Sequence, residues 1–83
     1  MNAINAAGNT IVPALLALER LGFKIAVEQL AGEQQCRATR GDESYCAEDP
    51  VTVLGLVRLI ELRGWNWRAS DLELHEKMHR YGL

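Results

Sequence analysis

The segment from Asp49 to Gly64 constrains the fold most, because it carries helix signals at both ends and apolar residues on more than one side. Asp accepts backbone N–H bonds at a helix N-cap, Pro50 suits the first helical position, and Gly64 is typical of the position just past a helix. The apolar residues between them form more than one stripe: Val51, Val53, Leu54, Leu56, Val57, Leu59, Ile60 and Leu62. Such a helix must be covered on more than one side.

Little chain is available to cover this helix. The 83 residues suffice for one domain and are too few for two. A domain of this size buries only about 60–65% of its unfolded surface, so its core is thin. Two interpretations of the surplus apolar face stay open. The sheet and the other helices could cover it, or it could meet a partner, most simply a second copy, with Gly55 allowing close backbone approach.

In the first part of the chain, the spacing of the apolar residues changes at Gly22 from that of a helix to that of a strand. A helix is predicted after Asn9 or Thr10, which suit an N-cap, and it ends at Gly22. Strict alternation over 23–28 then predicts a half-buried strand. Two more short strands are expected at 34–39 and 44–47, after turns at 31–33 and 40–43. Links this tight favour antiparallel pairing.

The last helix is predicted to start at Ser70, which can form a capping box with Glu73. Its apolar residues share one face: Leu74, Met78 and Tyr81. Together the elements predict an α+β fold in the order α-β-β-β-α-α, with a three-stranded antiparallel sheet packed on one face by helices. Residues 1–8 are expected to be a flexible leader and residues 9–83 a single domain.

The two cysteines lie on the later strands, and the register of their hairpin is open. Cys36 and Ala38 could be opposed by Tyr45 and Ala47, or by Cys46 in the alternative register. One residue of slip exchanges the two faces of a strand. We interpret both cysteines as small apolar core residues, because free Cys is among the most buried residue types.

The charge balance bears on the partners. Nine Lys and Arg against eleven Asp and Glu leave a net charge of −2, and nucleic-acid binders usually carry a basic surplus. Nucleic acid is therefore not an expected partner, although Lys24, Arg37 and Arg40 could share a surface. No secretory signal and no run of 18 apolar residues is visible, so no membrane partner is expected. Two cysteines without an export signal suggest a cytoplasmic protein.

The sharpest chemical motif is His75-Glu76-Lys77-Met78-His79, an H-E-x-x-H string. In zinc peptidases this spacing puts two imidazoles on one helix face and a carboxylate base beside the metal. Here only a few residues follow, no second half forms a cleft, and both histidines lie beside the apolar stripe of the last helix. We interpret the string as helix surface and predict neither a metal site nor a cofactor. No Gly-rich phosphate loop or nucleophile set occurs, so no catalytic residue is predicted and the protein is not expected to be an enzyme.

Trp65 and Trp67 are two residues apart in a short extended link, so their side chains would point to the same side. Trp is enriched at binding hot spots, although the simpler interpretation is that the pair caps the open end of the core, with at least one of them buried. The candidate binding residues are these two and three from the surplus face of the preceding helix: Trp65, Trp67, Leu56, Leu59 and Arg58.

The segment from Leu15 to Ile25, LLALERLGFKI, resembles the start of double-stranded-RNA-binding-like domains, and especially of the HicA-type interferase toxins. In those toxins a helix ends in a Gly-Phe step into a strand, and both groups run helix, three strands, helix. The resemblance covers about the first thirty residues and implies the element order. Its functional residues do not carry over. HicA-type toxins hold a Gly-Ser-His on the sheet, whereas the first histidine here is His75. The RNA binders open their second helix with lysines, whereas this one opens Glu48-Asp49-Pro50.

These observations predict a small non-enzymatic protein-interaction module, of the adaptor, inhibitor or immunity type, that acts through an apolar and aromatic surface. Its partner is another protein, or a second copy in a homodimer. The alternative function is a nucleic-acid-binding domain with double-stranded-RNA-binding-like element order. A third, remote alternative is a metal site at the H-E-x-x-H string.

Overall fold

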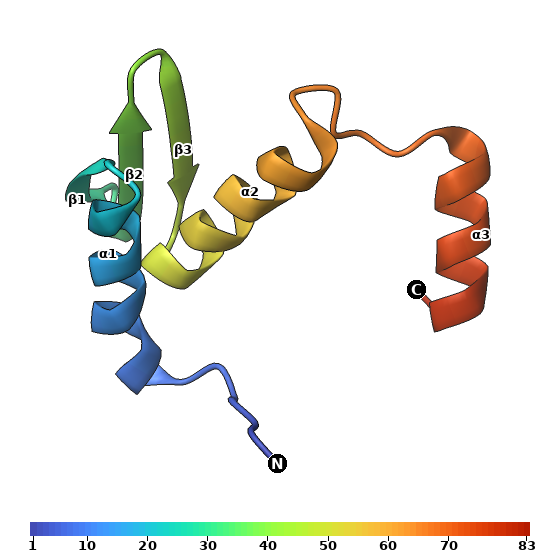
Figure 1. Ribbon diagram of the computed structural model, residues 1–83, viewed down its shortest axis with the longest axis horizontal. Coiled ribbons are helices and arrows are strands. Elements are labelled where there is room, and N and C mark those ends of the chain that lie inside the picture. The colour runs from blue at the N-terminus through green and yellow to red at the C-terminus, as the bar shows by residue number, and fades with distance from the viewer.

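A computed structural model describes residues 1–83 and contains the elements in the expected order (Figure 1). Their bounds are η1 Gly8–Thr10, α1 Ile11–Arg20, β1 Lys24–Leu30, β2 Glu33–Arg40, β3 Glu43–Ala47, α2 Pro50–Arg63 and α3 Asp71–Tyr81. The predicted α+β class with one three-stranded antiparallel sheet is confirmed. No helix has the length and apolar character that crossing a membrane requires.

The sheet has the order β1-β2-β3, and tight turns join its strands. Ala31 and Gly32 both have positive φ, 52° and 81°, which suits a two-residue hairpin turn. Before the sheet, Gly22 ends α1 at φ 94°, a conformation that few side chains tolerate. The Phe23 N–H then donates to the Leu18 carbonyl at 3.1 Å, so the chain enters β1 directly.

The structure also settles the open register. Ala38 lies opposite Tyr45, and Arg37 lies opposite Cys46. Because neighbouring residues of a strand point to opposite faces, Cys36 faces the helices while Cys46 faces outward. Cys36 is fully buried and Cys46 is exposed. The interpretation of Cys36 as a core residue is confirmed, and that of Cys46 is wrong because the register turns its thiol away from the core.

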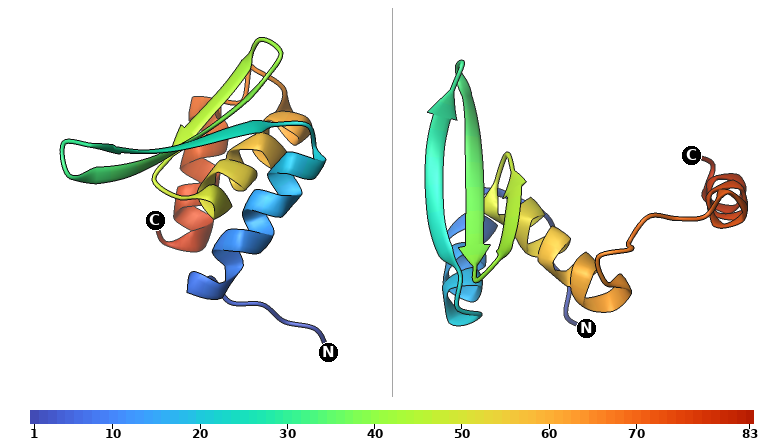
Figure 2. Two further views of the ribbon diagram at one scale, coloured as in Figure 1. Left: turned by 90° about the vertical axis from the view of Figure 1, so that its left-hand side faces the viewer. Right: turned by 90° about the horizontal axis from the view of Figure 1, so that it is seen from above.

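Helices α1 and α2 both pack on one face of the sheet (Figure 2). Their contact with the strands forms the core, which consists of Leu18, Phe23, Cys36, Ala38, Tyr45, Val53 and Val57. The sheet therefore covers the side of α2 that carries Val53 and Val57. Its opposite side receives no such cover.

The last helix does not close the fold. α3 has no buried residue, and it lies apart from the sheet and from α1 and α2 in Figure 1 and in the right-hand view of Figure 2. One interpretation of the surplus apolar face of α2 is that the first and last helices of the same chain cover it. The structure does not show that arrangement. α1 packs beside α2, but α3 leaves it open.

Candidate protein-binding surface

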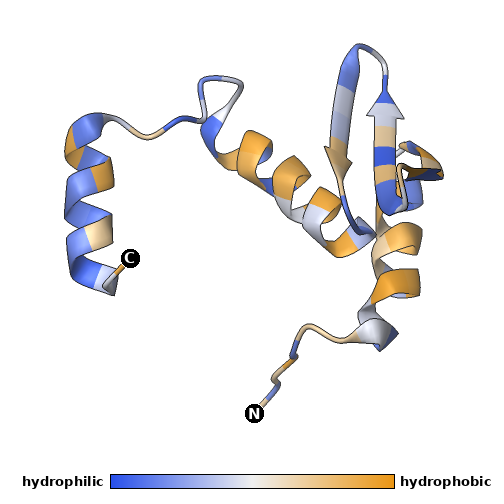
Figure 3. Ribbon diagram, turned by 180° about the vertical axis from the view of Figure 1, so that it is seen from behind, coloured by the Kyte–Doolittle hydropathy of each residue, from blue (hydrophilic) through white to orange (hydrophobic).

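The side of α2 away from the sheet carries an apolar row that we call the outer stripe, made of Gly55, Leu59 and Leu62. Residues four and seven positions apart share a helix face, and these three lie opposite Val53 and Val57. Leu62 is 69% exposed and Leu59 is half-buried. Colouring by hydropathy shows apolar residues along most of α2 (Figure 3). The outer stripe is therefore apolar surface that the chain itself leaves open.

The other two candidates on α2 have different surroundings. Leu56 is partly buried and packs against the core, so it supports the fold more than the surface. Arg58 is exposed beside the outer stripe, and its guanidinium lies 3.5 Å from the Glu61 carboxylate. An exposed pair of this kind contributes little to stability, so Glu61 holds the Arg58 side chain only weakly.

Trp65 follows α2 and turns back to the sheet. Gly64 adopts φ 74°, and its N–H donates to the Ile60 carbonyl at 2.7 Å, which ends the helix. The Trp65 ring then stacks on Tyr45, with ring centroids 5.7 Å apart and planes 23° apart. Its other side stays in water, and 59% of the residue is exposed.

Trp67 has other neighbours. The Arg68 guanidinium lies over its ring, 4.6 Å from the centroid, and 39% of the residue is exposed. The expectation that at least one of Trp65 and Trp67 is buried is wrong. The physical reason is that no helix or strand covers their exposed sides, because α3 does not return to the body of the fold.

Arg63 connects the end of α2 to the start of α3. Its Nε donates to the Trp67 carbonyl at 3.0 Å, and its guanidinium lies 3.4 Å from Glu73 Oε1. Glu73 Oε1 also accepts the Ser70 N–H at 2.8 Å, and the Ser70 hydroxyl accepts the Glu73 N–H at 3.2 Å, so the predicted capping box is present. These bonds from Ser70 and the nearby Arg63 hold the pKa of Glu73 below its usual range. Nothing in the sequence alone indicated this role of Arg63.

α3 presents a second apolar row, the α3 stripe, made of Leu74, Met78 and Tyr81. These residues are 49%, 42% and 66% exposed. His75 and His79 lie beside the stripe and line a shallow hollow with Leu74, Met78 and Leu83. No group of three or more His, Cys, Asp or Glu side chains in the chain is placed to hold a metal ion. Within the H-E-x-x-H string, Glu76 instead lies 3.3 Å from Arg80.

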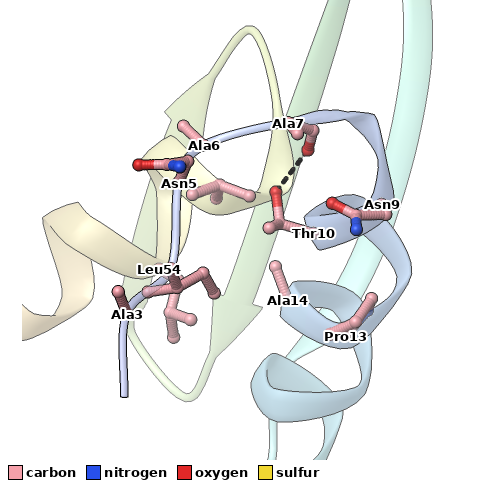
Figure 4. Close-up of a pocket in the computed structure, with 11 residues that line it drawn as sticks. Ala3, Asn5, Ala6, Ala7, Asn9, Thr10, Pro13, Ala14 and Leu54 are labelled. Carbon is pink, nitrogen blue, oxygen red and sulfur yellow. Dashed lines mark hydrogen bonds between the residues drawn. The ribbon is translucent and has the colours of Figure 1, made fainter. Parts of the chain in front are cut away.

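A larger hollow of about 720 Å³ lies where the first residues pass over α1 and α2 (Figure 4). The Thr10 hydroxyl donates to the Ala7 carbonyl at 2.6 Å and fixes the turn into α1. From the helices the lining includes Pro13, Ala14, Val51 and Leu54, and no charged side chain lines the hollow. Most of its walls are apolar, and its polar side chains are Asn5, Asn9 and Thr10.

The basic residues that could serve nucleic acid are only partly brought together. Lys24 and Arg37 lie on the outward face of the sheet, on paired strands. Arg40 instead donates to Glu43 at 3.0 Å and to the Leu21 carbonyl at 2.8 Å, with its guanidinium over the Phe23 ring. Arg40 therefore braces the fold, and nucleic-acid binding through all three residues stays a prediction.

Searches for related proteins give no functional lead, since no family model, no curated protein and no solved structure matches the chain.

Proposed function

We propose that the protein is a small non-enzymatic interaction module that binds another protein through the outer stripe of α2, together with Trp65 and Trp67. The observation that carries this proposal is the side of α2 left open by the sheet, where Leu62 is 69% exposed, followed along the chain by Trp65, which keeps 59% of its surface exposed although it stacks on Tyr45. Contiguous exposed apolar surface is a mark of interaction sites, and Trp is enriched among residues that dominate binding energy. Adaptors, inhibitors and immunity-type proteins all act by such stoichiometric binding.

A cytoplasmic location fits this role. Both cysteines are free, and Cys36 and Cys46 face opposite sides of the sheet, so they do not stabilise the fold by a disulfide. Free thiols are kept in that state in a reducing compartment.

The proposal is tested by photo-crosslinking in the native host. A photoreactive amino acid replaces Arg58, which is exposed beside the outer stripe, and a matched chain carries it in place of Arg37 on the outward face of the sheet. The expected result is one or a few discrete protein adducts from the Arg58 position and none of them from the Arg37 position. No adduct at the Arg58 position, or the same adducts from both, overturns the proposal.

A further inference from the structure

The chain exposes far more surface than a compact protein of its size. Its accessible area is 6794 Å² for a mass of 9.3 kDa, whereas a folded monomer of that mass exposes about 5,000 Å². Its radius of gyration is 15.0 Å, against about 12 Å for a compact domain of this length. Every residue from 61 to 83 is exposed. About 1,800 Å² per chain is therefore in excess, and the exposed α3 end and the exposed residues 1–9 both contribute to it.

α3 is nevertheless built as a helix that requires a partner. Its capping box and the left-handed Gly82, at φ 70°, define both ends. An isolated helix of 11 residues is only marginally stable in water, where roughly 12–15 residues are needed even for good helix formers. The α3 stripe has to be buried on apolar surface for this helix to gain tertiary support.

The link directs α3 away from its own α2. Trp65 is held at the start of the link by its stack on Tyr45, and Arg63 holds the far end through the Trp67 carbonyl and Glu73. With the start of the link held on β3 and its far end held by the last residue of α2, α3 is kept apart from its own α2, and its stripe is left for another molecule. The outer stripe of α2 stays open as well.

The outer stripe has a feature that the single chain does not use. A Cβ built on Gly55 meets no atom within 4 Å. Gly in a helix interior costs about 1 kcal/mol relative to Ala, so the chain alone has no use for glycine at this position. A glycine in the middle of an apolar helix face allows another backbone to approach closely.

We propose that two copies of the chain exchange α3, so that the α3 stripe of each copy packs on the outer stripe of the other and crosses it at Gly55. This inference rests on the proposed function, because it assigns a partner to the same surface. A second copy fits better than an unrelated protein because one two-fold contact covers both open stripes of both chains at once. The excess of the two chains, about 3,600 Å², lies within the range of about 2,000–5,000 Å² buried in obligate homodimers.

The first test measures the mass of the full chain in solution by light scattering over a series of concentrations. The wild-type chain is expected to be a dimer at micromolar concentration. Met78→Gln, in the α3 stripe, is expected to raise the dissociation constant about tenfold or more. Leu72→Gln, on the same helix but away from that stripe, leaves it unchanged. A wild-type monomer at high micromolar concentration, or equal effects of the two changes, overturns the exchange.

A second variant, Gly55→Leu, tests the same contact with a change that is not expected to unfold the monomer. Gly55→Leu adds a Cβ that meets no atom within 4 Å and introduces a better helix former on the exposed side of α2, so the monomer is expected to stay folded by circular dichroism. The dimer is expected to weaken because the crossing at Gly55 is filled. An unchanged dimer overturns the placement of α3 on the outer stripe.

Mixing two variants distinguishes exchange from other forms of self-association. Leu74→Glu breaks the α3 stripe and Leu59→Glu breaks the outer stripe, so each variant alone is expected to be monomeric. In their mixture, one intact α3 stripe meets one intact outer stripe, and a heterodimer is expected. No heterodimer in the mixture contradicts an exchanged arrangement.

The crosslinking experiment separates failure of the exchange from failure of the proposed function. An adduct of two copies of the chain at the Arg58 position supports both. A monomeric chain that still crosslinks to a different protein there overturns the exchange and keeps the proposed function. A monomeric chain without adducts overturns both.

Discussion

At the scale of single residues, Tyr45 joins the sheet to the link that follows α2. Its ring meets Phe23 edge-on, with centroids 5.6 Å apart, and Trp65 stacks on it. Its hydroxyl donates to Glu43 at 2.8 Å. Burial and this bond to an acidic group raise the pKa of Tyr45 to about 12, so the hydroxyl stays protonated as a donor over the whole physiological range.

The ring of Tyr45 is expected to matter more than its hydroxyl. Tyr45→Phe keeps both ring contacts and is expected to lower the free energy of unfolding by about 1 kcal/mol. Tyr45→Ala removes the ring from the core and is expected to lower it by about 3–5 kcal/mol. Urea unfolding followed by circular dichroism measures both, with Tyr81→Phe on the exposed face of α3 as the control. Equal losses for Phe and Ala at Tyr45 would contradict this account.

At the scale of elements, local capping chemistry decides where α2 begins. Asp49 Oδ1 accepts the Thr52 N–H at 2.9 Å, and Oδ2 accepts the Thr52 hydroxyl at the same distance. The bond from the Thr52 backbone is the main reason that the pKa of Asp49 lies below its usual range. Because the folded pKa is depressed, the charged cap stabilises the fold above the unfolded value and this contribution is lost as the pH falls through the folded value.

This cap gives a prediction with a pH signature. Asp49→Ala is expected to lower the free energy of unfolding by about 1 kcal/mol at neutral pH. Asp49→Asn keeps an oxygen acceptor at the cap without a titrating group. Its free energy of unfolding is expected to be little changed at neutral pH and to fall less than that of the wild type at acidic pH. Denaturant unfolding from neutral to acidic pH, with the two variants compared with the wild type, measures this. An Asn variant with the full acid dependence of the wild type would refute it.

The ends of the elements could be predicted from the sequence because the signals are local. Asp49 with Pro50, Ser70 with Glu73, and Gly64 each act through backbone groups within a few residues. The register of the second hairpin could not be predicted, because two registers place different residues inward and short strands with few large apolar residues do not choose between them.

The candidate surface could be predicted only in part, because it depends on packing between distant segments. The surplus of apolar residues on α2 indicated either cover by the rest of the chain or an open side, and in the structure Leu59 and Arg58 lie on or beside an open side. Leu56 packs against the core instead. The exposure of Trp65 and the position of α3 could not be predicted from the sequence. An apolar stripe indicates that a helix needs to be covered, but it does not indicate which segment or molecule covers it.

At the scale of the whole molecule, Arg63 is expected to control how α3 is shared between chains. Arg63→Ala removes the bonds to the Trp67 carbonyl and Glu73, so α3 is free to turn back onto its own α2 and compete with exchange. Exposed ion pairs contribute about 0.2–1 kcal/mol, so the dissociation constant of the dimer is expected to rise by up to about fivefold.

Light scattering measures this effect, and the radius of gyration of the dilute chain from X-ray scattering is expected to fall below that of the wild type. Arg80→Ala, which removes an exposed pair with Glu76 on the polar side of α3, is the matched control and leaves both quantities unchanged. A dimer that Arg63→Ala does not weaken, or that both variants weaken equally, would contradict a specific role for Arg63.

The stack of Trp65 on Tyr45 also gives the molecule an optical reporter. The chain has two tryptophans, and both lie in the link between α2 and α3. Their emission therefore reports the surroundings of the link, while far-ultraviolet circular dichroism reports the helices and strands. Dilution, heating or binding that shifts the emission before the dichroism changes identifies a rearrangement of α3 with the rest of the fold intact.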